Sequence, residues 1–233
     1  MRARSTGLIS AAALATAMSA TGALGQDLFA SPYLEFGGGL NSLSADLTNI
    51  DSDEIGPETS TLIDPMALGG TAYAAFGTSP MPGLRLALET NITNNTGARF
   101  NVQAEGSGTL LVDAMTFSVL AQIWKDFEIT DMISLHIGGG LGGGVIVAST
   151  TDDTPTTTTT TVPGLAYMAG FGADVDLGDG MILTLNYSLS GIGSGSVGTV
   201  PIETNDATET VTGDVSLSPK HAVTIGVRIP FGG

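Results

Sequence analysis

Two histidines and one acidic segment are the parts of this chain whose residue types could support chemistry. The chain has no cysteine, which excludes disulfides, thiolate metal ligands and cysteine nucleophiles. His221 could serve as a base, but its neighbours on the same face of a predicted strand, Pro219 and Val223, supply neither a serine nor an acid. We therefore expect no enzyme, with a lipid-modifying enzyme that uses His221 as a minor alternative.

The remaining candidates favour structural roles. His136 lies among small residues, and we expect it to point into an interior and contact a carboxylate. Asp51, Asp53 and Glu54 could collect oxygen ligands for Ca²⁺, but Ile55 occupies the ligand position before Gly56. A solvated acidic loop is the simpler interpretation. We predict no metal site and no cofactor.

Composition excludes several classes of protein. The 233 residues carry 23 acids against 7 lysines and arginines, a formal net charge of −16, so no basic surface is available for nucleic acid. With 42% hydrophobic and 13% charged residues, the chain should fold rather than remain disordered.

The N-terminus has the features of an export signal. Arg2 and Arg4 precede an uncharged stretch rich in Ala and Leu, and Ala23 and Gly25 are the small residues that a signal peptidase reads. A membrane helix would need ~18 or more apolar residues, and this stretch is interrupted by Ser and Thr. We predict a cleaved signal peptide over residues 1–25 and one β domain over residues 26–233.

Alternation of apolar with small or polar residues dominates the rest of the chain, as in two-faced strands. It is clearest at the C-terminus, where one face holds Val223, Ile225, Val227, Ile229 and Phe231. Eight such strands are expected, over residues 34–41, 66–76, 84–92, 111–123, 133–147, 165–177, 181–190 and 221–231.

The connections between these strands alternate in length. Short ones are expected at residues 77–83, 126–132 and 178–180, and long ones at 48–65, 93–109, 149–164 and 191–214. Short turns on one side and long loops on the other are typical of antiparallel strands that cross a bilayer, with ~9 to 11 residues per strand. The Thr-rich segment 154–164 suits either a mobile loop or an extended ribbon of two strands.

The charges on the small-residue face decide which face points inward. They are few and of both signs, and they could pair inside a narrow lumen, as buried charges require. An eight-stranded barrel has an interior that side chains just fill, and lipid would then contact the aliphatic face. Near the strand ends, Tyr33, Trp124, Phe127, Tyr167 and Phe231 are expected at the membrane interfaces. The predicted polar network of the lumen comprises Glu35, Arg85, Glu89, His136, Asp174, Asp176 and Arg228.

The signal sequence, the eight alternating strands and a last strand ending in Phe231 resemble the opacity-protein and OmpA-like eight-stranded outer-membrane barrels of Gram-negative bacteria. The resemblance implies an antiparallel up-and-down transmembrane β-barrel in the outer membrane, in contact with lipid and lipopolysaccharide. It also implies that the last strand, with Val223, Ile225, Val227, Ile229 and Phe231, is the signal read by the outer-membrane assembly machinery.

Three functions follow from these expectations. The first is a non-enzymatic protein with an envelope-structural role whose loops meet host or other surface ligands. The second is a narrow porin-like channel that favours cations because the loops are anionic. The third is a secreted soluble β-barrel, with the apolar face turned inward around a small apolar ligand.

Overall fold

The computed structural model describes residues 31–51, 60–64, 66–103, 107–151, 157–193, 196–203, 210–217 and 219–231. Among these residues, no helix has the length and apolarity that crossing a membrane requires. Strands dominate: β1 (Pro32–Asp51), β2 (Ser60–Asp64), β3 (Met66–Met81), β4 (Leu84–Gln103), β5 (Ser107–Glu128), β6 (Ile133–Thr151), β7 (Thr157–Gly178), β8 (Met181–Ile192), β9 (Ser196–Glu203), β10 (Thr210–Leu217) and β11 (Lys220–Pro230).

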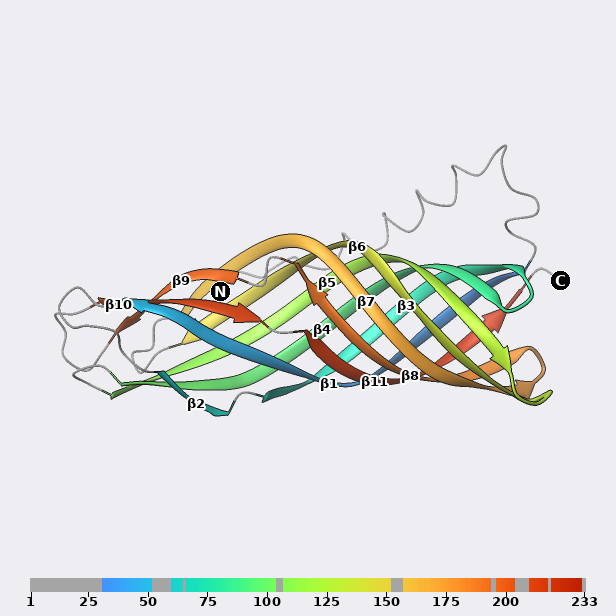
Figure 1. Ribbon diagram of the computed structural model, residues 1–233, viewed down its shortest axis with the longest axis horizontal. Helices are drawn as coiled ribbons and strands as arrows, with labels where there is room; N and C mark the ends of the chain where they lie inside the picture. Colours follow the sequence, from blue (N-terminus) through green and yellow to red (C-terminus); the bar gives the residue numbers. More distant parts are fainter. Residues whose placement is uncertain are drawn as a thin grey trace, which may run out of the picture.

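Eight of these strands close into a barrel. Antiparallel neighbours follow the order β1, β3, β4, β5, β6, β7, β8 and β11, and β11 pairs again with β1. Figure 1 shows the resulting elongated, twisted barrel. The closure leaves no free edge over the paired length, which a bilayer requires because unpaired backbone groups are costly there. The predicted fold class and strand number are confirmed.

The start of β1, the end of β11 and the short turns lie at one end of the barrel, which we call the turn end. The amide of Phe231 donates to the carbonyl of Pro32 at 2.9 Å. Strands β7 and β8 are joined through Asp179, which has a φ of 54° between two glycines that also have positive φ. The expected hairpin at residues 178–180 is therefore confirmed.

The opposite end, called the ribbon end, differs from the expectation of long loops. β4 and β5 stay paired up to Gln103 and Ser107, and β6 and β7 up to Thr151 and Thr157. The loops expected at 93–109 and 149–164 are thus mostly strand, and the ribbon alternative holds for the described part of the Thr-rich segment. Beyond a membrane both faces of a hairpin meet water, so apolar alternation ends while backbone pairing continues.

Three further strands extend this end. β10 pairs with the last residues of β1, β9 pairs with β10, and β2 pairs with the last residues of β4. They lie together on the left of Figure 1, away from the turn end. The segment 191–214, expected to be a loop, thus contains a hairpin arm in its described residues, and the segment 48–65 contains β2.

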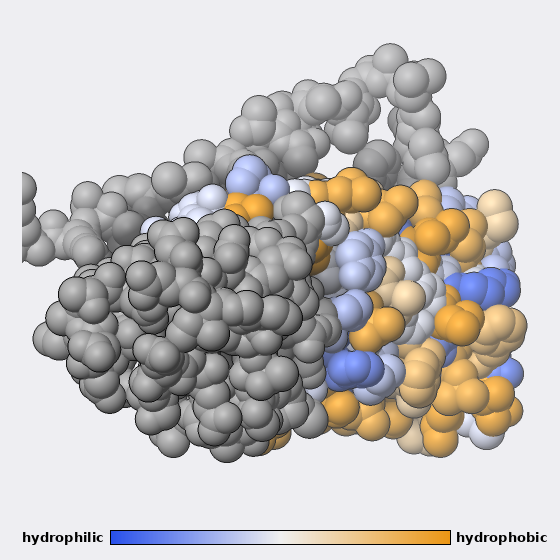
Figure 2. All heavy atoms as spheres, turned by 60° about the vertical axis from the view of Figure 1, so that its left-hand side comes forward, coloured by the Kyte–Doolittle hydropathy of each residue, from blue (hydrophilic) through white to orange (hydrophobic). Residues whose placement is uncertain are grey.

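The apolar face of the barrel points outward. Leu40 is 74% exposed, and Leu141 and Ile225 are also more than half exposed, whereas the inward Thr184 is fully buried. Apolar residues cover much of the described outer surface in Figure 2. The soluble barrel with its apolar face inward is therefore wrong: the aliphatic side chains occupy the position of a lipid-facing surface.

Two breaks in the alternation, Leu120 and Met168, point inward and form a small apolar cluster with Trp124, Ala166 and the partly buried Ile192. Trp124 and Tyr33 are 8% and 3% exposed, so their predicted interfacial positions are wrong. On its strand, each of the two side chains lies on the same face as polar residues that point inward. Gly138 leaves the space that the Trp124 indole fills, because a Cβ on Gly138 would lie 2.5 Å from the ring.

Candidate functional site

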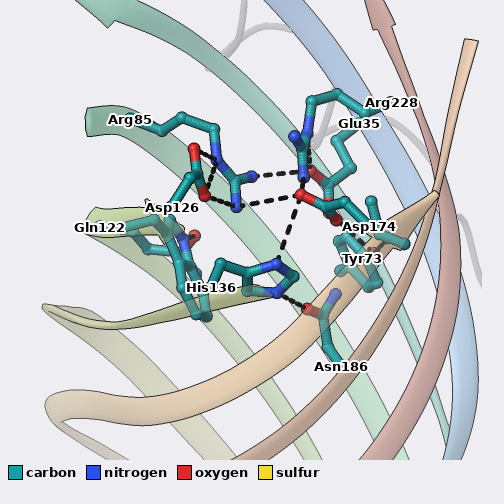
Figure 3. A network of polar contacts seen from close by, with 11 residues as sticks. Glu35, Tyr73, Arg85, Gln122, Asp126, His136, Asp174, Asn186 and Arg228 are labelled. Carbon is teal, nitrogen blue, oxygen red and sulfur yellow. Dashed lines mark hydrogen bonds and ion pairs between the residues drawn. The ribbon is translucent and has the colours of Figure 1, made fainter. Parts of the chain in front are cut away.

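Six side chains form a charged cluster across the turn-end half of the lumen: Glu35, Arg85, Asp126, His136, Asp174 and Arg228 (Figure 3). Arg228 lies between two carboxylates. Its Nε donates to Glu35 Oε2 and its Nη2 to Asp174 Oδ2, each at 2.9 Å. All three residues are buried, so each charge in this part of the cluster has an opposite charge beside it, as burial demands.

Arg85 occupies the other side of the cluster. Two of its nitrogens donate to the Asp126 carboxylate, Nε to Oδ2 at 2.9 Å and Nη2 to Oδ1 at 2.8 Å. This is the bidentate geometry that a planar guanidinium forms with a carboxylate. Arg85 also lies 3.7 Å from Glu35 and 3.6 Å from Asp174, so it connects three acids from three strands.

His136 completes the cluster from β6. Its Nδ1 lies 3.3 Å from Asp174 Oδ2, and its Nε2 lies 2.5 Å from Asn186 Oδ1. The ring stands edge-on to Trp124, with ring centroids 5.3 Å apart. Its contacts are an acid, an amide and an indole, so the histidine links two polar neighbours, and none of its partners among the described residues is a nucleophile.

Two tyrosines pack against Glu35 and Arg228, which lie on the paired first and last strands of the barrel. The Tyr73 hydroxyl donates to Glu35 Oε1 at 3.0 Å and lies 3.4 Å from the Thr184 hydroxyl. The guanidinium of Arg228 lies 5.4 Å from the centre of the Tyr33 ring, within range of a cation–π contact. Glu35 is thereby held by donors from β3 and β11.

Five of the seven residues predicted for the lumen network thus lie in one cluster, and the other two do not. Glu89 points into the lumen but makes no ion pair with the other residues that the structure describes; it lines the two interior cavities described below. Asp176 is exposed, because β7 ends there and its carboxylate accepts from the Gly178 amide at 2.8 Å. Its inclusion in the network is wrong.

Sequence reasoning missed Asp126, Tyr73, Gln122 and Asn186. Asp126 was expected in a turn, whereas β5 continues to Glu128. Asp126 shares the inward face of that strand with Gln122 and Trp124, and the same alternation used elsewhere could have found it. Gln122 accepts from the Trp124 ring nitrogen at 3.0 Å.

Asp126, His136 and Asp174 have the ligand types of a metal centre, with candidate atoms within 4.8 Å of one another. The arginines argue against such a centre. Arg85 lies 2.8 Å from Asp126, and Arg228 lies 2.9 Å from Asp174. The guanidinium groups therefore already supply the positive charge that a metal ion would bring.

Two cavities lie between the charged cluster and the ribbon end. The smaller, of about 20 Å³, adjoins the cluster and is lined by Glu35, Arg85, Glu89, Gln122 and His136 among others. The larger, of about 70 Å³, is lined by Glu89, Lys220 and the apolar cluster among others. Side chains of the charged cluster fill the turn-end half of the lumen, and the two cavities leave the part toward the ribbon end partly open.

His221 lies outside the lumen. It is exposed on β11, and its Nδ1 is 2.6 Å from the hydroxyl of Tyr187. This contact provides neither the serine nor the acid of a triad, and nothing in it adds support for the lipid-modifying alternative.

A closed antiparallel barrel with an apolar exterior and a polar, charge-paired interior defines an outer-membrane β-barrel. The family described as outer membrane protein beta-barrel domain matches residues 9–229 of the chain. The chain belongs to this family, and its place is the bacterial outer membrane.

Solved structures are similar to this chain at low sequence identity. OprG from Pseudomonas aeruginosa is 15% identical, with 87% of this chain and 97% of that chain covered and a TM-score of 0.55. Neisserial surface protein A (NspA) is 14% identical, with 86% and 97% covered and a TM-score of 0.47. Ail of Yersinia pestis, in complex with the heparin analogue sucrose octasulfate, is 14% identical, with 85% and 99% covered and a TM-score of 0.46. No curated protein matches the chain.

Proposed function

We propose that this chain is a non-enzymatic structural protein of the outer membrane whose lumen is sealed by the charged cluster. One observation carries the proposal: Arg85 and Arg228 are each held by carboxylates from more than one strand, which places a layer of paired charges across the lumen (Figure 3). An eight-stranded barrel has little interior beyond what side chains fill. A narrow porin-like channel would need this layer to open.

Orientation in the membrane follows from the two unlike ends. We place the turn end in the periplasm, since short periplasmic turns and longer external connections are the rule for this class. The proposal includes a cleaved signal peptide over residues 1–25 and lipopolysaccharide around the outer part of the barrel. The last strand, with Val223, Ile225, Val227, Ile229 and Phe231, would be the segment recognised by the assembly machinery.

The ribbon end would then face the outside of the cell. β6 and β7 stay paired up to Thr151 and Thr157, and β10 and β9 add to the end of β1. These strands give the external part a paired framework on which acidic segments can be displayed to host or other surface ligands. The chain's net charge of −16 favours partners with positive charge and disfavours nucleic acid.

Solute flux through reconstituted protein tests the sealed state. Purified protein, shown to be folded by its different mobility before and after boiling in detergent, is placed in liposomes loaded with a K⁺-sensitive dye. We expect K⁺ entry no faster than in empty liposomes, with a large porin as the positive control. Steady K⁺ entry in the folded protein would replace this proposal with the narrow channel.

Absence of enzymatic activity is tested at His221, the one base on the outer surface that sequence reasoning singled out. We expect a His221→Ala strain to keep the lipid profile of the wild type. A changed profile with a normally folded barrel would identify a lipid-modifying enzyme instead.

A further inference from the structure

One edge of β7 near the ribbon end carries an inference beyond the sealed barrel. β7 pairs with β6 along residues 157–175, but its pairing with β8 begins only at Ala166. One further hydrogen bond on that side runs from the Gly193 amide to the Leu165 carbonyl, at 2.6 Å. Within the described part of the chain, residues 157–164 therefore have a paired strand on one side only. In Figure 1, β7 continues toward the ribbon end beyond the end of β8.

The strand that follows β8 in the chain does not pair with this edge. β9 continues the course of β8, because β8 pairs with β11, β9 pairs with β10, and β10 and β11 both pair with β1. If the register of Ala166 with Ile192 continued, Val162 would lie opposite Ser196. Instead, β10 is the one strand with which β9 pairs among the described residues. The hydrogen-bonded wall is thus interrupted between β7 and β9.

The composition of this edge suits a strand that accepts a partner. Residues 157–162 are five threonines and a valine, and both residue types favour strands. Protein edges are commonly protected against pairing by charged side chains, prolines or bulges. Residues 157–162 carry no charge, and Pro163 lies at the end of the stretch nearer β8. Leu165, which is 63% exposed, is the last long aliphatic residue before this edge, so the edge begins where the apolar face ends.

Charge selects the kind of strand that this edge can accept. The segments 149–164 and 191–214, which contain the edge and β9, hold two and four acids respectively, and neither holds a lysine, arginine or histidine. A second copy of the chain would bring the same acids to the edge, and like charges across neighbouring strands are destabilising. A cationic segment is instead attracted to this end of the barrel.

We propose that residues 157–162 of β7 bind an extended cationic peptide segment, which adds to the sheet as a strand beside β7. Main-chain hydrogen bonds supply the affinity of such an added strand, and its basic side chains supply the preference for this acidic end. The inference deepens the proposed display role and rests on it, because that role places the ribbon end outside the cell. It does not depend on the sealed lumen, since the edge lies in the wall beyond the charged cluster.

Peptide binding in neutral nanodiscs tests the proposal. Protein shown to be folded by the boiling test is placed in phosphatidylcholine nanodiscs and titrated with a fluorescent peptide of alternating Lys and Val, about eight residues long. We expect saturable binding, about tenfold weaker or more when every backbone amide of the peptide is methylated, because methylated amides cannot pair with a strand edge. A peptide of alternating Glu and Val should also bind more weakly. Absent binding, equal binding of the methylated peptide, or tighter binding of the acidic peptide would overturn the proposal.

Matched threonine variants locate the peptide. The chain has no cysteine, so Thr161→Cys on β7 and Thr96→Cys on β4, both at exposed positions, can each carry a single bimane label. A nitroxide on the peptide should quench the label at position 161 and leave the label at position 96 nearly unchanged. Thr159→Lys places a protective charge on the edge and should weaken binding about tenfold, whereas Thr96→Lys should change it little. Equal quenching at the two positions, or unchanged binding in folded Thr159→Lys, would reject the edge as the site.

Failure of this inference can be told apart from failure of the sealed state. K⁺ entry into liposomes is measured without peptide, so absent peptide binding leaves the sealed barrel in place. Steady K⁺ entry would remove the sealed state and leave the binding of the peptide at the β7 edge unaffected.

Discussion

Glu35 and Arg228 face each other across the seam that closes the barrel. They are register partners on β1 and β11, 193 positions apart in the chain, and their side chains meet with Arg228 Nε 2.9 Å from Glu35 Oε2. The first and last strands of the barrel are thus joined by backbone pairing and also by a buried ion pair. Because the same arginine also binds Asp174 of β7, the seam is tied to a strand that lies beyond β8 in the wall.

Removal of Arg85 should open a leak for cations. Arg85→Ala deletes the side chain that connects Asp126, Glu35 and Asp174 and leaves their carboxylates facing the lumen. We expect measurable K⁺ entry into liposomes, faster than Cl⁻ entry, because Glu35, Asp126 and Asp174 then outnumber Arg228 and the cluster is net negative. Lys125→Ala, which removes an equal charge from the outer face, is the control and should behave like the wild type. Absence of any leak in folded Arg85→Ala would show that the arginine is not part of the seal.

Two adjacent glycines of β6 should differ in their response to alanine. A Cβ on Gly142 would lie 1.9 Å from the carbonyl oxygen of Val119, whereas a Cβ on Gly143 would meet nothing within 4 Å. Gly142→Ala should therefore lower the free energy of unfolding by ~1 to 3 kcal/mol, as overpacking does. Gly143→Ala should be neutral or slightly stabilising, since alanine loses less backbone entropy on folding. Urea unfolding followed by Trp124 fluorescence measures both, and equal effects would refute the close approach.

Phe231 should matter more for assembly than for stability. It and Phe127 are both exposed aromatics near the turn end, at 43% and 49%. We expect Phe231→Ala to lower the fraction of heat-modifiable protein in the outer membrane, and Phe127→Ala to leave that fraction near the wild-type value. Once purified and refolded, the two variants should unfold at similar urea concentrations. A large loss of stability confined to Phe231→Ala would assign the residue a packing role, for example with Phe76.

Alternation along the strands predicted most of the fold because a barrel wall separates lipid from a polar interior. The same pattern placed Glu35, Arg85, His136, Asp174 and Arg228 on one face, although nothing in it specifies which charges meet. Those pairings depend on strand tilt and register around the barrel, and they bring together residues such as Glu35 and Arg228 from its first and last strands.

The errors have physical causes as well. Beyond the membrane, segments rich in Thr and Asn lose their apolar face and resemble loops, yet the backbone of residues 144–151 still pairs with that of residues 157–164. Trp124 and Tyr33 were assigned from residue type, which favours an interface, whereas their strand positions turn both inward. Asp126 was assigned to a turn because the end of β5 could not be located from composition.

The ion pair between Glu35 and Arg228 should help to hold the barrel closed, and a double-mutant cycle on these two residues tests this most directly. The free energy of unfolding is measured in urea with lipid vesicles for the wild type, Glu35→Gln, Arg228→Met and the double variant. Arg228→Met leaves the buried carboxylates of Glu35 and Asp174 without this guanidinium, so we expect a loss of ~3 kcal/mol or more. We expect a smaller loss for Glu35→Gln, because Arg228 keeps Asp174 as a partner, and a coupling of more than ~1 kcal/mol. Single effects that add to within about 0.5 kcal/mol would contradict the claim that this pair helps to hold the barrel closed.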